Sequence, residues 1–464
     1  MSDNTNYGAN SLSSNTTGIQ NSAFGDLSLQ KNETGNYNSS VGAFALAKNT
    51  TGISNSALGT NSLLENTTGS YNTAIGTATM CFNTSGNENT AIGSNCLENN
   101  TTGYHNTAVG VSALYTNTTA DRNTAVGVHA LYSNTSGENN LAIGVDSLKN
   151  NISGSQNVAF GNQSLKSNTS GDFNISIGPS ALFSNTTGLN NVAVGTTALN
   201  DNIIGNTNVA VGHASLYNNL ADGNVAVGHE SLYSNTNGIQ NVAVGYQSLK
   251  ANTTGINNSA IGYNSLQTNT TGEYNSAFGG YALAANLTGK YNNAFGQSSL
   301  TANITGENNC AFGTNALVDN DSGDKNVAIG NSSLAANTSG YENVSVGYNS
   351  LSGNTTGYDN TVIGSSCATS LTTGYNCTVI GYGAEPSGSN ASNEITLGNG
   401  SITALRCQQP LTVLSDIRDK KDIVSLEPES GIEFVSKLNP VNFVWNMRDG
   451  GKVDIPSQGF IAQE

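Results

Sequence analysis

Apolar and polar residues follow one another in a unit that returns every seventeen residues along most of this chain. The unit reads N-[S/T/V]-A-[V/I/F]-G-x-x-[A/S]-L-x-x-N-T-[T/S]-G-x-x, and residues 106–122 and 123–139 are two consecutive copies. The glycine that closes the first half of the unit recurs from Gly8 to Gly381. A fixed short period is typical of a solenoid, so this repeat predicts most of the fold.

The repeat keeps its phase with one exception, a step of sixteen residues between Gly212 and Gly228. The missing residue falls within Leu220–Gly223, where other copies carry T-[T/S]-G-x-x, so we expect the loss to shorten a turn. Leucine follows the glycine by four residues in most copies, with Met80 and Ala368 as exceptions and Glu385 where the pattern ends.

A unit of seventeen residues is too short for two helices, since helical-hairpin repeats need about 33 to 47 residues. Its Gly, Asn, Thr and Ser content disfavours helix and suits strands and turns. We therefore predict a strand at N-T-A-V-G, a second strand at [A/S]-L-x-x, and turns at G-x-x and N-T-T-G. Stacked coils of this kind form an all-β, parallel β-solenoid of about 24 coils, roughly 110 Å long.

The recurring residues then form columns along the stack. We expect each Leu to lie on the Leu of the next coil, in an apolar column shared with the Val, Ile or Phe before the glycine. The small Ala leaves room for an opposite wall or for another chain. The two Asn columns are expected to form amide ladders, as in cross-β stacks.

Composition narrows the class of protein. The 464 residues are 36% hydrophobic and 10% charged, with a net charge of −16. So thin a core favours extra burial between chains, and regular Leu argues against disorder. Without a basic stripe, the chain offers no nucleic-acid surface and no attraction to anionic membranes. Its start shows no signal peptide, and no apolar run is long enough to cross a membrane.

Motifs for metals, cofactors and glycans are weak. The six cysteines show no C-x-x-C or Cys/His spacing, so we predict free thiols, with Cys367 and Cys377 as the nearest candidates for a pair. His213 and His229 are expected to stack on adjacent coils. No phosphate-binding loop and no repeated Asp for calcium occur, so no cofactor and no metal are predicted. The many N-x-[S/T] triplets are taken as incidental, because glycans would break an Asn ladder.

The repeat gives way to other sequence near residue 381, which divides the chain into a shaft (1–381), a terminal coil and neck (382–414), and a C-terminal segment (415–464). In the neck, Asn393–Gly398 predicts a degenerate last coil and Ser401–Leu405 a closing strand. In the last segment, Pro428–Leu438 has helical spacing, and Val441–Trp445 predicts a strand.

Two resemblances enter at this point. The N-[S/T]-A-[V/I]-G-x-x-[S/A] unit resembles the head repeats of trimeric autotransporter adhesins, whose β-roll coils assemble as three-chain needles with a shorter unit near fourteen residues. The C-terminal segment resembles the intramolecular chaperone, or peptidase S74, domain of bacteriophage tail fibres and tailspikes. The matching residues are Ser415, Asp416, Arg418, Lys420 and Ile423, then L-N-P at 438–440 with Trp445, and G-F-I-A-Q-E at 459–464.

The second resemblance implies a chemistry. In that family the chaperone trimerises, aligns three shafts and cuts itself off near the S-D junction. Carried over, Ser415 is the nucleophile, Lys420 the base that activates it, and the cut lies next to Asp416. The family domain extends past the length matched here, so the copy is incomplete. Such a cut is a single turnover, and no multiple-turnover enzyme is predicted.

The leading hypothesis is a homotrimeric virion fibre, a tail fibre or tailspike shaft made in the host cytoplasm. Its partners would be an upstream tail protein at the N-terminus and a glycan or protein receptor on the host. The alternative is a bacterial surface adhesin of the trimeric autotransporter type. A glycan hydrolase would need paired carboxylates, and we expect no acids to cluster across adjacent coils of the shaft. An ice-binding solenoid would need Thr on a flat strand face, whereas N-T-T-G predicts a turn. Tyrosines that follow the Leu column either offer sugar-stacking faces or cover that column (Tyr115, Tyr132, Tyr217, Tyr233).

Overall fold

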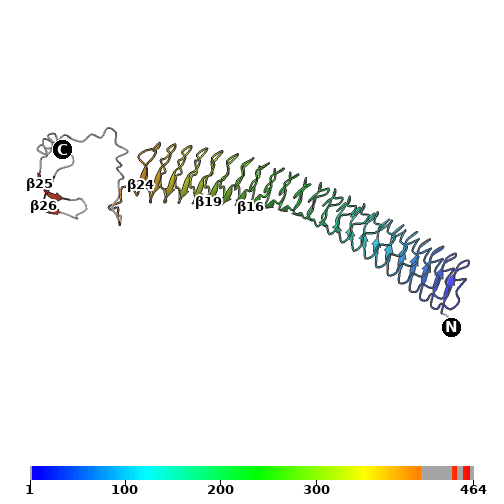
Figure 1. The fold of residues 1–464 in the computed structure, drawn as a ribbon. Coiled ribbons are helices and arrows are strands. Elements are labelled where there is room, and N and C mark those ends of the chain that lie inside the picture. The colour runs from blue at the N-terminus through cyan, green and yellow to red at the C-terminus, as the bar shows by residue number, and fades with distance from the viewer. Residues whose placement is uncertain (1–2, 407, 409–440, 447–452, 460–464) are drawn as a thin grey trace, which may run out of the picture. The chain divides into compact units, whose positions relative to one another are not determined.

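The computed structural model describes residues 3–406, 408, 441–446 and 453–459. The chain divides into two compact units, Met1–Leu397 and Gly398–Glu464. Figure 1 shows the first unit as a long stack of narrow coils, with one strand arrow in each coil.

The first unit holds a single parallel sheet of 24 strands, in which each strand pairs with the strands before and after it in sequence. The sixteen-residue step keeps this register, because Val209 still pairs with Val225. This confirms the predicted parallel β-solenoid with coils of about seventeen residues. The strands are β1 (Thr5–Tyr7), β2 (Ser22–Phe24), β3 (Ser39–Val41), β4 (Ser56–Leu58), β5 (Thr73–Ile75), β6 (Thr90–Ile92), β7 (Thr107–Val109), β8 (Thr124–Val126), β9 (Leu141–Ile143), β10 (Val158–Phe160), β11 (Ile175–Ile177), β12 (Val192–Val194), β13 (Val209–Val211), β14 (Val225–Val227), β15 (Val242–Val244), β16 (Ser259–Ile261), β17 (Ser276–Phe278), β18 (Asn293–Phe295), β19 (Cys310–Phe312), β20 (Val327–Ile329), β21 (Val344–Val346), β22 (Thr361–Ile363), β23 (Thr378–Ile380) and β24 (Ile395–Leu397).

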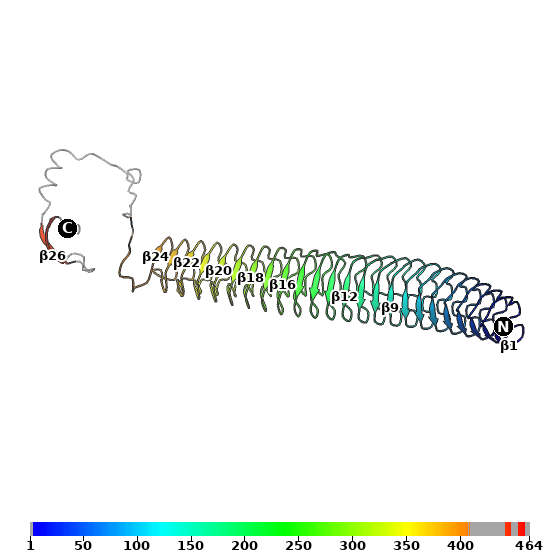
Figure 2. The ribbon, with the colours of Figure 1, turned by 90° about the horizontal axis from the view of Figure 1, so that it is seen from below.

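The other half of each coil is not a strand, so the predicted second strand at [A/S]-L-x-x is wrong. In the coil after β11, Ser180 and Leu182 both have positive φ, 54° and 48°, which no β-strand contains. Alternate residues still bond between coils: Leu182 N donates to Ala198 O at 2.9 Å and Ser180 N donates to Asn162 O at 2.9 Å. Figure 2 shows these segments as a wall of rounded turns beside the sheet. This half of the coil is therefore built from turns in place of a β-strand, and its backbone amides still form hydrogen bonds with the neighbouring coils.

The core of the solenoid is closed within one chain. The middle Ala of each strand and the Leu column are buried almost everywhere, as Ala193 and Leu199 in adjacent halves of one coil illustrate at 0% exposure. These residues belong to one continuous cluster along the stack. The sequence left open whether the small Ala faces an opposite wall or another chain. The structure shows that it faces the opposite wall of its own coil.

The expected position of the Val, Ile or Phe before the glycine is wrong. Within a three-residue strand the side chains alternate, so when Ala points inward the residues on both sides of it point outward. In β2 the middle Ala23 is fully buried while Phe24 is 40% exposed. These apolar side chains therefore line the outside of the sheet and do not share the Leu column.

Both predicted Asn ladders are present. In the first, Asn38 Oδ1 accepts hydrogen bonds from the N and Nδ2 of Asn55, at 3.0 and 3.1 Å. In the second, Asn49 Nδ2 donates to Asn32 Oδ1 at 2.8 Å and to the turn carbonyl of Gly52 at 3.0 Å. These amides are fully buried, so each ladder satisfies polar groups that would otherwise cost about 1–3 kcal/mol apiece.

Both Asn ladders continue through the sixteen-residue coil. Ala221 O replaces the usual glycine carbonyl, because it accepts from Asn208 Nδ2 at 2.8 Å and from Asn219 Nδ2 at 2.7 Å. Asn219 in turn accepts from Asn235 Nδ2 at 2.8 Å. The lost residue is absorbed by the turn, as the sequence predicted.

The stack ends at the degenerate coil with β24, which pairs with β23 as expected. In the coil of β23, Glu385 occupies the Leu position, and its carboxylate accepts from the N–H groups of Thr369 and Ser370, at 2.9 and 3.1 Å. Elsewhere the amide two residues after Leu donates to a backbone carbonyl of the next coil, as Lys48 N does to Leu64 O, and at Ser370 the Glu385 side chain takes the place of that carbonyl. The predicted closing strand at Ser401–Leu405 is wrong: those residues are exposed and form no strand.

In the second unit, β25 (Val441–Asn446) and β26 (Val453–Gly459) form an antiparallel pair, with Trp445 opposite Ile455. The strand predicted around Trp445 is therefore present. The helix predicted at 428–438 lies outside the described residues.

Candidate functional site

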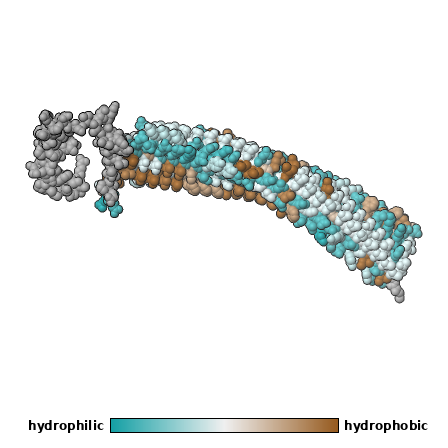
Figure 3. Space-filling model, in the orientation of Figure 1, coloured by the Kyte–Doolittle hydropathy of each residue, from teal (hydrophilic) through white to brown (hydrophobic). Residues whose placement is uncertain are grey.

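An apolar stripe runs along the outer face of the sheet. It consists of the third residue of each strand from β1 to β24. Every one of these 24 residues is Val, Ile, Leu, Phe or Tyr. Many are exposed: Val41 by 44%, Leu58 by 50% and Phe160 by 52%. Figure 3 shows hydrophobic residues gathered along the lower edge of the C-terminal half of the solenoid.

The stripe changes in width along the sheet. The first residue of each strand shares the outer face, and it is Ser or Thr from β1 to β8 but Leu, Val or Ile from β9 to β15. Towards the C-terminal end the third position carries a stack of rings, with Phe278–Phe295 and Phe295–Phe312 centroids 4.7 and 4.5 Å apart. The apolar face is thus broadest in the middle coils and bulkiest near β17–β19.

The stripe is not needed to close the coil, because the Ala and Leu columns already form a buried core on the other side of the strand. Soluble monomers rarely expose a continuous apolar surface of this kind, and such surfaces mark association sites. The sequence carried the signal, since alternation about the Ala places the neighbouring positions on the opposite side. The sequence-based prediction placed these residues in the Leu column and therefore did not foresee the apolar stripe.

Aromatic side chains also stack along the turns. His213 and His229 lie with centroids 5.0 Å apart, as predicted, and the column continues to Tyr246 and Tyr263. Tyr115 stacks on its neighbour Tyr132 at 5.1 Å, and both are half-buried, not exposed. Because such rings turn their faces toward the next coil, they offer mainly their edges to a sugar.

Glu342 and Asp359 lie together on neighbouring coils, contrary to the expectation that acids do not cluster in the shaft. Desolvation and the hydrogen-bonded neighbour Glu342 raise the pKa of Asp359. Glu342 also bonds Lys325 Nζ at 2.7 Å, and that ion pair is largely exposed. A glycosidase needs one carboxyl group protonated inside a substrate cleft, and this solvent-facing pair is not enclosed by one.

Glu98 is the one described acid with a buried carboxylate oxygen, Oε2, that has no hydrogen-bond partner. Desolvation raises the pKa of this group. A raised native pKa favours folding at low pH, and this contribution is lost as the pH rises through it. We expect Glu98→Gln to raise the melting temperature at pH 7, with the gain shrinking toward pH 4, in calorimetric scans at both values.

The matched control for that experiment is Glu65→Gln, two coils away. Glu65 is paired with Lys48 at 2.6 Å, so its neutralisation removes an attraction and should give no gain. A gain of equal size in both variants, or one that does not depend on pH, would contradict the role of desolvation at Glu98.

The described cysteines, including Cys367 and Cys377, are free thiols. Burial raises the pKa of the Cys96 thiol to about 12 and that of Cys367 to about 11, so both are poor nucleophiles at neutral pH. Within the described ranges, no three His, Cys, Asp or Glu side chains come together as metal ligands. The same ranges contain no helix with the length and apolar character needed to span a membrane.

The residues predicted to carry cleavage, Ser415, Lys420 and the adjoining Asp416, lie outside the described residues. The structure therefore gives no geometry for them.

Comparison with known proteins places the C-terminal segment. Residues 415–464 match the family model of peptidase S74, the chaperone of endosialidase. No curated protein and no solved structure is significantly similar to the chain. A β-solenoid followed by a segment similar to this chaperone fits a tail fibre or tailspike with a C-terminal chaperone domain, as the sequence predicted.

Proposed function

We propose that this chain is a subunit of a homotrimeric virion fibre for host attachment, in which the apolar stripes of three solenoids pack against one another. The observation that carries the proposal is the stripe itself. It runs along a sheet whose own core is already complete, and it consists of apolar residues in all 24 strands. Burial of this surface would contribute roughly 25 cal/mol for each Å² removed from water.

The stripe supports lateral association of parallel chains, and the number three rests on the two resemblances. Both the adhesin head repeats and the S74 fibres that the sequence resembles assemble as trimers. A stripe on one side of a narrow solenoid suits a closed ring of subunits, in which each chain presents the same face to a central axis.

The near-identity of the coils gives the chaperone its task. Two chains displaced by one coil would restore almost every contact of the stripe, so the correct register is separated from slipped ones by little free energy. A C-terminal segment that fixes the chain ends together removes the slipped arrangements. Residues 415–464 are proposed to act in this way, with an upstream tail protein bound at the other end.

Self-cleavage is proposed at the start of the same segment, with Ser415 as nucleophile and Lys420 as its base. We expect protein made from the full gene to appear as a trimer of chains that end near Ser415. Ser415→Ala should leave the chain at full length, because alanine has no hydroxyl to attack the peptide bond. Native and denaturing mass spectrometry of both proteins measure this.

The two halves of the proposal fail separately. An uncut trimer in the unaltered protein would reject cleavage and keep the fibre. A folded, uncut monomer would reject both, and Lys420→Ala provides the matched test of the base.

A further inference from the structure

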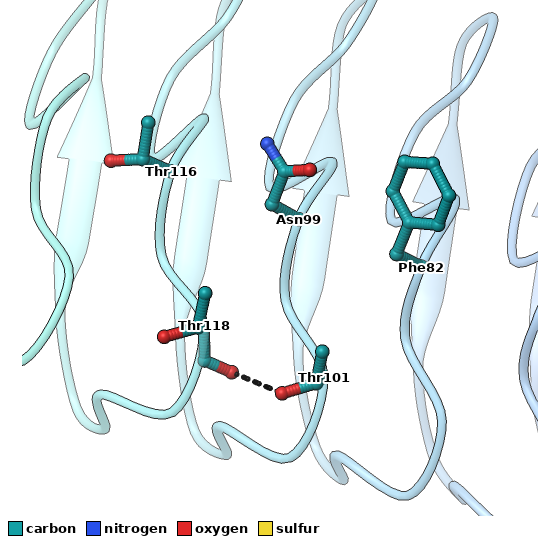
Figure 4. A pocket seen from close by; sticks show the side chains of 5 residues that line it. All are labelled: Phe82, Asn99, Thr101, Thr116 and Thr118. Carbon is teal, nitrogen blue, oxygen red and sulfur yellow. Dashed lines mark hydrogen bonds between the residues drawn. The ribbon is translucent and has the colours of Figure 1, made fainter.

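One groove on the first unit lies away from the apolar stripe. It has a volume of about 530 Å³ and is lined by Phe82, Asn99, Thr101, Thr116 and Thr118, from three successive coils. Figure 4 shows these side chains on chain segments that pass in front of the strand arrows, not on the strands. The groove would therefore stay open when the stripes of several chains are packed together.

Phe82 makes this place different from every other coil. In the column two residues after the Leu position, Phe82 is the only aromatic residue in the repeat, where other coils carry residues such as Asn99 and Thr116. Its side chain is 45% exposed and stacks on no other ring within the described ranges. The ring is seen nearly face-on in Figure 4, so it presents a flat apolar surface at one end of the groove.

The polar groups around the ring present mainly acceptors. The hydroxyl of Thr101 donates to Thr118 O at 3.0 Å, and that of Thr116 donates to Tyr132 O at 2.9 Å. Asn99 Nδ2 donates to Tyr115 O at 3.0 Å, and its Oδ1, which points towards the side of Phe82 in Figure 4, has no partner in the described chain. The second N–H of the Asn99 amide and the exposed Thr118 hydroxyl remain as donors for a ligand.

None of the five lining side chains carries a charge. Phosphates and other anions need several donors or cations, which this groove lacks. A ligand that suits it is neutral, rich in O–H donors, and apolar on one flat face that can lie on the Phe82 ring. A pyranose sugar has these properties, and the site is shallow and open to solvent, which suits a ligand that keeps part of its surface in water.

We propose that this groove is a binding subsite for a neutral pyranose, with Phe82 as the stacking platform and Asn99, Thr101, Thr116 and Thr118 as partners for its hydroxyls. This inference rests on the proposed role in host attachment, and it gives one receptor contact a place and a chemical class. The groove does not depend on how many chains assemble.

The test is saturation-transfer NMR of the full-length protein with the methyl glycosides of glucose, galactose and N-acetylglucosamine, and with glucuronate as a charged analogue. At least one neutral glycoside should show transfer, and glucuronate should show little. Phe82→Ala should weaken binding about tenfold, and Thr118→Val should weaken it less. The control is Phe173→Ala, which removes a ring that is 50% exposed outside the groove and should change nothing.

Absence of transfer to all three neutral glycosides would overturn the subsite, as would transfer that persists unchanged in Phe82→Ala. Native mass spectra of the same samples report the oligomeric state. A monomer that still binds sugar through Phe82 would reject the trimer alone, and a trimer without binding would reject the subsite alone.

Discussion

Lysine placed in the stripe at two coils, Val194→Lys with Val227→Lys, should convert the assembled fibre into folded monomers. Both positions are third residues of their strands, β12 and β14, and Val227 is 36% exposed in the single chain. Each lysine would be harmless in a monomer but would be buried without a partner when stripes pack together, and an unpaired buried charge costs several kcal/mol. Sedimentation velocity measures the mass, and circular dichroism checks the fold.

The control is Val111→Lys with Val145→Lys. These two valines are 49% and 47% exposed, but each follows the strand-closing glycine and lies off the strands. The control protein should assemble as the unaltered one does. If both double variants assembled normally, or both dissociated, the stripe would not be the association surface.

Alanine at Gly195 should break the stack locally and lower the free energy of unfolding by several kcal/mol. The residue closes β12 with φ of +137°, a region that is almost exclusive to glycine. An added Cβ would also lie 2.5 Å from Gly212 O, a backbone atom held in the next coil. Neither strain can be relieved by rotating a side chain, so thermal unfolding should begin at a lower temperature.

Gly280→Ala is the matched control, because Gly280 has no positive φ and an added Cβ would meet its nearest atom, Tyr263 O, at 4.0 Å. That variant should unfold within about 1 °C of the unaltered protein, since surface changes without strain are usually within ±0.5 kcal/mol. Equal losses in both variants would show that the chain is sensitive to any added methyl group, and not to the strand-closing glycine.

The sequence alone determined the parts of the fold that follow from repetition. A seventeen-residue period with Gly, Leu and Asn at fixed places requires that like residues stack on like residues. Parallel register, the buried Leu column and both Asn ladders are consequences of that stacking. The His213–His229 stack follows in the same way, and so does the tolerance of the sixteen-residue step within a turn. The motifs after Ser415 likewise identified the segment that matches the chaperone of endosialidase.

Other features depended on the backbone geometry of each coil and on its contacts with the neighbouring coils, and the sequence period does not reveal either. Ser180 and Leu182 adopt positive φ, so the second half of the coil became a turn even though its amides still bond from coil to coil. The Glu385 carboxylate accepts hydrogen bonds from the N–H groups of Thr369 and Ser370 in the preceding coil. Only the folded coil shows that Ala and Leu complete the core from within one chain. The apolar stripe and the Phe82 ring are therefore on the outside of the solenoid. The residues beside them belong to neighbouring coils.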